Sequence, residues 1–322
     1  MPGKPAYIYY HMDFDGLGSI PIAHHLLKNK GFSPVIERPV DFNIKPLWQG
    51  KKISVKHPLV IVDFPYRNDA FAYFDHHNSN RPVERSPETE LFIFDKNAKS
   101  CASLLYNALL GDGVDADELA DPVYWCDIID SKSYLQHNIS ITDYLYSDQP
   151  ALMLSKCLEV AAIENKPMFW NSLAERLIKN PSIKDTCKDA EVMERYKTFM
   201  ENQDEAIRLL KKNSRYDRST GIVTYDATSK LWSRYGLALI HPDSLLWVVL
   251  IKTKKGLDAK ISQNPWNPKS QEVLDQTDIG DILKKYGGGG HKFGGSAHFS
   301  SHRKAKTSMR EIKGHIQRKI LG

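Results

Sequence analysis

The stretch Tyr73-Phe74-Asp75-His76-His77-Asn78 joins an apolar run to a carboxylate and two imidazoles. Apolar, β-prone residues begin at Ala70, and a polar segment broken by prolines follows from Asn78 to Pro87. This pattern predicts a buried strand that ends in a loop, with Asp75-His76-His77 at its carboxyl end. Because ligands of open α/β sheets bind at the carboxyl ends of strands, the triplet is a candidate site. An ordinary surface loop is the alternative for the triplet read by itself.

A second polar loop follows another apolar, β-prone run, Ala6–Tyr10. His11, Asp13 and Asp15 alternate along this loop, and alternate side chains of an extended segment point the same way. They can therefore converge on one ion or on a close pair of ions. Imidazole combined with carboxylates suits Mn²⁺, Mg²⁺ or Fe²⁺ better than it suits a thiolate-rich zinc site. Helix capping is the alternative, because a helical pattern begins at Leu17, but a cap needs only one carboxylate.

Two further carboxylates extend the candidate site. Asp63 follows the buried-strand pattern Leu59–Val62, so it is another carboxylate at the end of a strand. Asp127 lies among apolar and aromatic residues of a predicted helix, Asp121–Asp130, where an ionised carboxylate needs a partner such as a metal. Exposure on an outer turn of that helix is the alternative. Together these segments offer enough ligands for two divalent ions: His11, Asp13, Asp15, Asp63, His76 and Asp127.

The bulk composition is that of a globular chain with room for two domains, with 322 residues of which 41% are hydrophobic. No apolar run approaches the length that spans a bilayer, and the N-terminus has no signal-peptide core. The four cysteines are scattered without zinc-ligand spacing. We therefore expect a cytoplasmic protein with no membrane partner. The C-terminal stretch His302–Lys319 is strongly basic, and both a positive arm and an ordinary solvated helix are open interpretations.

The order of the elements predicts the α/β class, with a mostly parallel N-terminal sheet flanked by helices and a smaller α+β C-terminal domain. The predicted domains are 1–186 and 214–322. They are joined by a linker helix at 187–213, which is long, charged and without proline or glycine. Apolar runs in the second domain predict strands at Gly221–Tyr225, Leu245–Ile251 and Leu257–Ser262, before a short helix at Asp278–Tyr286.

A glycine-rich stretch follows that last helix and reads Gly287-Gly288-Gly289-Gly290-His291-Lys292. Consecutive glycines can leave backbone N–H groups pointing inward, where they form an anion-binding nest. His291 adds a proton donor, and Lys292 adds a positive charge at the same place. The stretch is therefore a predicted phosphate cradle. A flexible hinge is the alternative for a glycine run read by itself.

These residues, taken in order, resemble the motifs of the DHH phosphoesterase family. The four motifs are His11-x-Asp13-x-Asp15-Gly16, then Asp63, then Asp75-His76-His77, then Asp127. The glycine-rich stretch resembles the GGGH signature of the C-terminal domain usually associated with these enzymes, so the resemblance covers nearly the whole chain. The layout is most similar to the branch that contains oligoribonucleases and 3′-phosphoadenosine-5′-phosphate phosphatases.

The resemblance implies a dinuclear Mn²⁺ site, with Mg²⁺ or another divalent ion as the alternative. By matching position, the first ion would be held by His11 and Asp13, and Asp63 would bridge the two ions. The ligands of the second ion would be Asp15, His76 and Asp127. His77 would contact the scissile phosphate, and Asp75 would orient the histidines. The substrate's far end would be bound by Gly288, Gly289, Gly290, His291 and Lys292.

The chain departs from that branch in two motifs. Motif one usually has three residues between its histidine and its first aspartate, whereas only Met12 stands there in this chain. Asp13 and Asp15 are therefore firmer ligands than His11. The fourth motif usually reads Asp-Thr-Gly, whereas Asp127-Ile-Ile-Asp130 leaves Asp130 as a rival ligand.

The activity we expect is hydrolysis of a small phosphate ester, either a short oligonucleotide degraded from one end or a nucleotide bisphosphate. The expected partner is therefore a short nucleic acid or a nucleotide phosphate. A phosphodiesterase acting on polyphosphate or on cyclic dinucleotides is the runner-up. A non-catalytic nucleotide-binding protein is the alternative from another class. A homodimer is left open.

Overall fold

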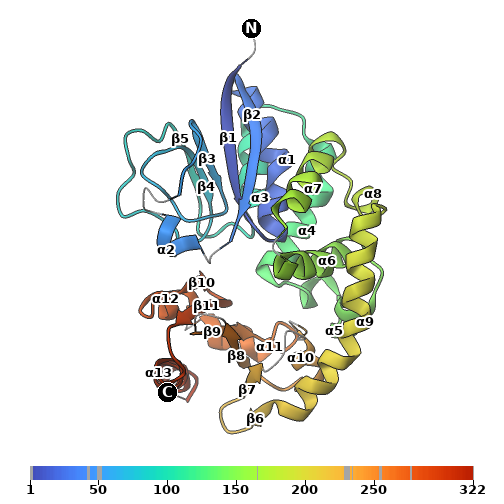
Figure 1. Cartoon of the computed structure of the whole chain (residues 1–322), viewed down its shortest axis with the longest axis vertical. Coiled ribbons are helices and arrows are strands. Elements are labelled where there is room, and N and C mark those ends of the chain that lie inside the picture. Colours follow the sequence, from blue (N-terminus) through green and yellow to red (C-terminus); the bar gives the residue numbers. More distant parts are fainter. Residues whose placement is uncertain are drawn as a thin grey trace. The chain divides into compact units, whose positions relative to one another are not determined.

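The chain forms two compact units (Figure 1). The computed structural model describes residues 3–41, 44–48, 53–164, 166–227, 233, 235–253, 256–275 and 278–321. The first unit comprises Met1–Ser133 and Asp148–Phe199, and the second comprises Tyr134–Ser147 and Met200–Gly322.

A five-stranded sheet with the order β2-β1-β3-β4-β5 forms the first unit, and every neighbouring pair in it is parallel. Its strands are β1 (Lys4–His11), β2 (Phe32–Val40), β3 (Leu59–Val62), β4 (Ala70–Asp75) and β5 (Leu91–Phe94). The predicted α/β class with a parallel N-terminal sheet is confirmed. Parallel strands end at one edge, and the strand order reverses between β1 and β3. Such a reversal marks the place where open α/β sheets bind ligands.

Strand β2 was not predicted, because its sequence contains Pro34 and Pro39. Proline has no N–H to donate to a sheet, so it is tolerated mainly on edge strands. The topology fits this rule, since β2 pairs only with β1 and lies at the sheet edge among the described strands.

Helices pack on one side of this sheet, where Figure 1 shows α1, α3, α4 and α7 gathered together. The helices of the first unit are α1 (Phe14–Asn29), α2 (Lys45–Trp48), α3 (Cys101–Gly111), α4 (Ala120–Ser131), α6 (Pro150–Glu164), α7 (Pro167–Lys179) and α8 (Ile183–Thr186). A 3₁₀ turn at Asp117–Leu119 precedes α4. The long helix α9 (Ala190–Asn213) belongs to both units, since the division falls after Phe199.

Aromatic side chains cover the other face of the sheet. Tyr9 and Tyr73, which alternate with residues that face the helices, pack against Trp48 and Phe64 in one buried cluster. The indole of Trp48 donates a hydrogen bond of 2.6 Å to the carbonyl oxygen of Pro65. This bond fixes the loop after β3, the strand that leads into Asp63.

The second unit contains a six-stranded sheet with the order β10-β11-β9-β8-β7-β6, in which only the pair β7 and β8 is parallel. Its strands are β6 (Arg215–Asp217), β7 (Ile222–Ala227), β8 (Leu246–Thr253), β9 (Gly256–Gln263), β10 (Gly289–His291) and β11 (Gly294–Phe299). Its helices are α5 (Ile141–Tyr146), α10 (Gly236–Ile240), α11 (Pro268–Asp275), α12 (Ile279–Lys284) and α13 (His302–Leu321). Helix α13 is the basic C-terminal stretch, and it buries Ala305, Met309 and Ile312 in the core of this unit.

The segment Tyr134–Ser147 packs in the second unit, although the predicted first domain, 1–186, included it. The ring of Tyr134 stacks on Trp266 at 5.0 Å between ring centroids, with an interplanar angle of 5°. The indole of Trp266 also donates a hydrogen bond of 2.9 Å to the carbonyl oxygen of Ile139. This packing joins a segment of the N-terminal sequence to C-terminal residues, and the sequence carries no local signal for it.

No helix in the described parts of the chain is long and apolar enough to cross a membrane. All four cysteines are buried, and none forms a disulfide.

Candidate metal centre

The carboxyl edge of the first sheet gathers the predicted ligands. His11 is the last residue of β1, Asp63 follows β3 directly, and Asp75 is the last residue of β4. The three strands are neighbours in the sheet, so their ends bring these residues together. This placement follows from the short apolar runs that make each strand end at its polar residue.

The first group of ligands consists of His11, Asp13 and Asp63. The Nδ1 atom of His11 lies 2.8 Å from Oδ2 of Asp13 and 3.3 Å from Oδ2 of Asp63. Asp13 is also the N-cap of α1, where its Oδ1 accepts a 2.8 Å hydrogen bond from the backbone N–H of Gly16. One carboxylate therefore has two roles: Oδ1 of Asp13 caps the helix, and Oδ2 faces His11 in the ligand group.

The second group consists of Asp15, His76 and Asp130. The Nε2 atom of His76 lies 3.6 Å from Oδ2 of Asp15 and 3.4 Å from Oδ2 of Asp130. Nδ1 of His76 lies 3.0 Å from the carbonyl oxygen of Ala98. Because a carbonyl only accepts hydrogen bonds, Nδ1 carries a proton, and Nε2 is the ring nitrogen that faces the carboxylates. A metal-binding histidine is usually held in this way.

Asp63 lies between the two groups. Its Oδ2 faces His11, and its Oδ1 lies 3.8 Å from Nε2 of His76 and 3.1 Å from Nδ1 of His77. Oδ1 is fully buried, yet no described donor reaches it with hydrogen-bond geometry. The backbone of Asp63 has a φ of 56°, in a region that few residues other than glycine adopt. A strained backbone that presents an unsatisfied buried oxygen is typical of a functional residue.

The carboxylate of Asp75 is fully buried and accepts five hydrogen bonds. Oδ1 accepts from the backbone N–H groups of His76 and His77, at 2.7 and 2.8 Å, and from Nδ1 of His77 at 2.7 Å. Oδ2 accepts from the hydroxyl of Tyr73 and from Nδ2 of Asn80, each at 2.9 Å. With both oxygens engaged in this way, Asp75 is suited to orient His77 rather than to bind an ion.

Asp127 is not part of either group, although the resemblance placed it there and Asp130 was its rival. The Oδ1 atom of Asp127 accepts a 2.6 Å hydrogen bond from the hydroxyl of Ser100. Among the described residues, the group around His76 contains Asp130 instead. The two aspartates are three residues apart on α4, so they are neighbours on its surface and packing alone decides between them.

The charges of the edge shift the pKa values of its members. Burial and the repulsion of Asp63 and Asp130 raise the pKa of Asp15 well above its usual range. Burial also raises the pKa of Asp130, to about 6, against the attraction of His76. Burial alone would lower the pKa of His11, but the neighbouring carboxylate of Asp13 raises it well above the ordinary value. All three shifts favour bound protons, so positive charge stabilises the carboxylates at this edge of the sheet.

The pair formed by Asp75 and His77 is strongly polarised. Burial alone would lower the pKa of His77, but the attraction of Asp75 and Asp63 raises it well above its ordinary value. In turn, burial would raise the pKa of Asp75, and the attraction of His77 lowers it. The pair therefore behaves as an imidazolium held against a carboxylate.

These residues fit two divalent cations. The donor set of imidazoles and carboxylates matches the preference of Mn²⁺ and similar ions. Asp63 belongs to two groups of potential ligands, one with His11 and Asp13 and a further one with Asp75, His76 and His77. Its Oδ2 faces His11, and its unsatisfied Oδ1 faces His76, so one carboxylate serves both sides of the centre.

The glycine-rich stretch forms a hairpin, in which β10 pairs with β11 in antiparallel register. The N–H groups of Gly287 and Gly288 donate to the carbonyl oxygens of Lys284 and Leu283 of α12, each at 3.0 Å. These two groups therefore close the end of a helix. A Cβ at Gly288 would collide with the carbonyl oxygen of Ser296, so close packing explains this glycine.

The phosphate-binding role of Gly288, Gly289, Gly290, His291 and Lys292 stays a prediction. The backbone of His291 lies in β10, but its side chain is outside the described residues. The ammonium of Lys292 lies 5.9 Å from the centroid of the Phe293 ring.

Two residues of the site, Tyr73 and Asn80, were not identified from the sequence, and both donate to Asp75. Ser100, which donates to Asp127 and so holds it outside the ligand groups, was not identified either. Asn80 follows Asp75-His76-His77 within the same loop, and this nearness in sequence is the signal that points to it. Ser100 carries only the weak signal of a helix-capping residue before α3.

No protein-family model matches the chain, and no curated protein matches it in sequence. Solved structures do share its fold. PggH from Vibrio cholerae, a pGpG-specific phosphodiesterase, is 18% identical with a TM-score of 0.63, over 98% of this chain and 100% of that chain. An exopolyphosphatase-related protein from Bacteroides fragilis is 11% identical with a TM-score of 0.56, over 99% of this chain and 94% of that chain.

RecJ from Thermus thermophilus, solved in complex with Mn²⁺, is 14% identical with a TM-score of 0.56. The match covers 98% of this chain but 52% of RecJ. The chain therefore has the fold of DHH phosphoesterases, and the resemblance inferred from its motifs is confirmed at the level of the fold.

Proposed function

We propose that the protein is a metal-dependent phosphoesterase that uses two divalent cations, Mn²⁺ in the first place, to hydrolyse small phosphate esters. One observation carries this proposal. The carboxylate of Asp63 is common to two groups of ligands, one with His11 and Asp13 and one with His76. A shared carboxylate is what two adjacent ions require.

The residues divide into holders of ions and residues that position the substrate. His11, Asp13 and Asp63 would hold the first ion. Asp63 would also contribute to the second, together with Asp15, His76 and Asp130. When bound, such a pair of ions supplies Lewis acidity to phosphoryl oxygens and activates water near neutral pH. The fixed protonation of His76 at Nδ1 keeps its other nitrogen available as a ligand.

His77 and Asp75 would act on the substrate rather than on the ions. Asp75 accepts from Nδ1 of His77, so it fixes the orientation of the ring and stabilises its positive charge. A cationic imidazole at this edge is suited to bind an oxygen of the scissile phosphate and to donate a proton to the leaving oxygen.

The substrate we propose is a short oligonucleotide or a nucleotide bisphosphate, with the protein acting as an exonuclease of the oligoribonuclease type. PggH is a pGpG-specific phosphodiesterase, so a protein of this fold supports a nucleotide substrate. Residues 288–292 would bind the non-reacting end. The polyphosphate alternative is favoured by one observation, the exopolyphosphatase-related neighbour.

A product assay on purified, metal-stripped protein tests the proposal. The protein is given Mn²⁺ and, separately, a labelled dinucleotide, a long single strand, a cyclic dinucleotide, a nucleotide bisphosphate and polyphosphate. We expect metal-dependent loss of the dinucleotide or the bisphosphate, with the long strand cleaved more slowly. Cleavage of polyphosphate or of the cyclic dinucleotide alone would establish the runner-up. Bound metal with no turnover of any substrate would make the chain a nucleotide-binding protein.

A further inference from the structure

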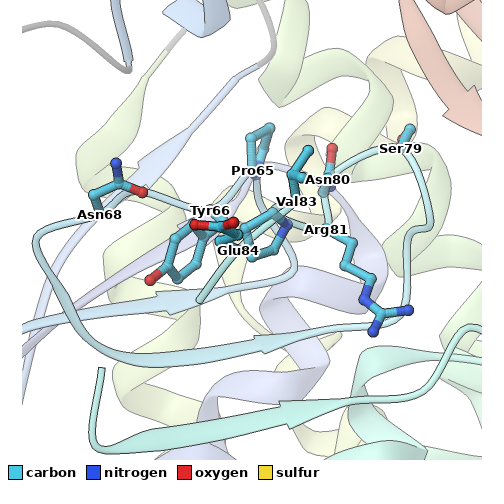
Figure 2. Close-up of a pocket in the computed structure, with 9 residues that line it drawn as sticks. Pro65, Tyr66, Asn68, Ser79, Asn80, Arg81, Val83 and Glu84 are labelled. Atoms are coloured by element: carbon cyan, nitrogen blue, oxygen red, sulfur yellow. The ribbon is translucent and has the colours of Figure 1, made fainter. Parts of the chain in front are cut away.

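A pocket of about 550 Å³ lies beside the metal centre, within the first unit. It is formed by the loops that follow β3 and β4 (Figure 2). Pro65 of its wall is two residues from Asp63, and Ser79 is two residues from His77. Two residues of chain span at most about 7 Å, so the pocket adjoins both segments of the centre. Its volume falls in the range of small-molecule sites, about 300–1,000 Å³.

Hydrogen bonds fix the pocket relative to the metal centre. Asn80 is buried, donates through Nδ2 to Asp75, and donates through its backbone N–H to the carbonyl oxygen of His77 at 3.0 Å. The hydroxyl of Tyr66 is 2.7 Å from Oγ1 of Thr89 and accepts from the N–H of Ser86 at 2.8 Å. A ligand in this pocket would therefore be held in a defined position relative to Asp75.

The lining is mixed and carries no net charge. Apolar surface comes from Pro65, Pro82 and Val83, and polar side chains come from Asn68, Arg81 and Glu84. Figure 2 shows Asn68 and Arg81 at opposite ends, with Glu84 and Tyr66 between them. Arg81 is the cation and Glu84 the anion of the lining, so their charges balance. Such a lining suits a nucleoside, which has an apolar ring face and polar edges, better than it suits a chain of phosphates.

Two arginines of the same loop differ in how they are used. The guanidinium of Arg85 lies 5.5 Å from the ring centroid of Phe92 and donates hydrogen bonds to the carbonyl oxygens of Thr89 and Glu90. The guanidinium of Arg81 lies 5.2 Å from the ring centroid of Phe94. Within the described part of the chain, Arg81 makes no hydrogen bond or ion pair. Arg85 thus holds the loop, whereas Arg81 keeps its donors available.

The contact with Phe94 places Arg81 at the carboxyl edge of the sheet. Phe94, on which it lies, is the register partner of Asp75 in the neighbouring strand. Adjacent strands are about 4.8 Å apart, so Arg81 borders the same edge of the sheet. A planar guanidinium stacks on aromatic rings and donates to oxygens and ring nitrogens.

We propose that this pocket, with Arg81 at its border, binds the nucleoside that adjoins the phosphate held at the metal centre. This inference rests on the proposed function, since it assumes that a phosphate ester is bound at Asp63 and His77. It makes the pocket the place where a nucleotide is distinguished from a phosphate ester that lacks a base.

Two chromogenic diesters test the proposal, because they share a leaving group and differ in the nucleoside. They are thymidine 5′-monophosphate p-nitrophenyl ester and bis(p-nitrophenyl) phosphate. The measured quantity is kcat/KM for the thymidine ester divided by kcat/KM for bis(p-nitrophenyl) phosphate. We expect this ratio to fall about tenfold in Arg81→Ala, which is the effect of one lost charge-assisted contact. Val83→Trp, which fills the lip of the pocket from a side chain that is 104% exposed, should lower the ratio as well.

Arg85→Ala is the matched control. It should lower the melting temperature, because its hydrogen bonds hold the loop, and leave the ratio unchanged. An unchanged ratio in both Arg81→Ala and Val83→Trp, or an equal fall in Arg85→Ala, would overturn the proposal. If the wild-type protein hydrolyses neither diester, the dinucleotide and bisphosphate assay decides on the proposed function, and equilibrium dialysis with thymidylate decides on the pocket. Weaker binding by Arg81→Ala than by wild type supports it, and equal binding overturns it.

Discussion

The acidic edge of the first sheet and the glycine hairpin of the second unit, formed by β10 and β11, both have sequences that predict phosphate chemistry. Their polar groups are used differently. At the acidic edge, Asp63 keeps a buried oxygen without a hydrogen bond among the described residues, and carboxylates face one another. In the hairpin, Gly287 and Gly288 donate to carbonyl oxygens of α12. A polar group binds a ligand most readily where the fold leaves it unsatisfied, and Oδ1 of Asp63 at the edge is such a group.

Among the substitutions that test this comparison, we expect the largest loss of activity at Asp63. Asp63→Asn keeps the size of the side chain and tolerates the positive φ, but it removes the charge shared by the two ligand groups. We expect the variant to lose about 4 kcal/mol of transition-state stabilisation by the metal ions, which corresponds to a fall of about 10³-fold in kcat. The assay measures kcat with Mn²⁺ and a dinucleotide. Full activity in this variant would disprove the bridging role.

A smaller effect distinguishes the two aspartates of α4. Asp130→Asn should lower Mn²⁺ affinity and activity by about 100-fold or more, because a ligand near His76 is lost. Asp127→Asn is the control, since its amide oxygen can still accept from Ser100, and we expect activity within a few-fold of wild type. Isothermal titration with Mn²⁺ measures both affinities. A larger loss of Mn²⁺ affinity in Asp127→Asn than in Asp130→Asn would show that Asp127 is the ligand.

The hairpin offers a test of stability rather than of activity. Gly288→Ala should lower the free energy of unfolding by about 1–3 kcal/mol, because its Cβ meets the carbonyl of Ser296. Gly314→Ala, inside α13 and with its nearest neighbour at 3.6 Å, should raise it by about 0.5–1 kcal/mol. Urea unfolding of the metal-free protein measures both. A stable Gly288→Ala variant that loses phosphate binding would show that this glycine serves the ligand instead.

The smallest effect concerns pH. Mn²⁺ must displace protons from carboxylates whose pKa values are raised, and the pKa of Asp130 is raised to about 6 by burial. Protonation below that value opposes binding, so Mn²⁺ affinity should fall as the pH decreases through 6. For one displaced proton the loss between pH 7 and pH 5 is about tenfold. Titrations at both pH values check this, and Asp130→Asn should reduce the dependence. A constant affinity would contradict the assignment of Asp130 as a ligand.

The pattern of apolar runs was sufficient to predict which residues reach the edge of the first sheet. Buried parallel strands are short, continuous apolar runs, so the position at which each run ends placed His11, Asp63 and Asp75 at that edge from the sequence alone. The same reasoning missed β2, because its prolines are compatible only with an edge strand and the sequence does not state which strand is at the edge.

Which polar atoms are available for a ligand was settled only by folding. Asp127 and Asp130 are neighbours on one helix, and contact with Ser100 or with His76 separates them only after α3 and α4 have packed. The glycines of the hairpin gained their packing role from contact with β11 and α12, which are brought together in the folded chain. Periodicity along a chain fixes the direction of a side chain relative to its own element. Whether its polar atoms find partners depends on elements distant in sequence, and a local pattern carries no information about them.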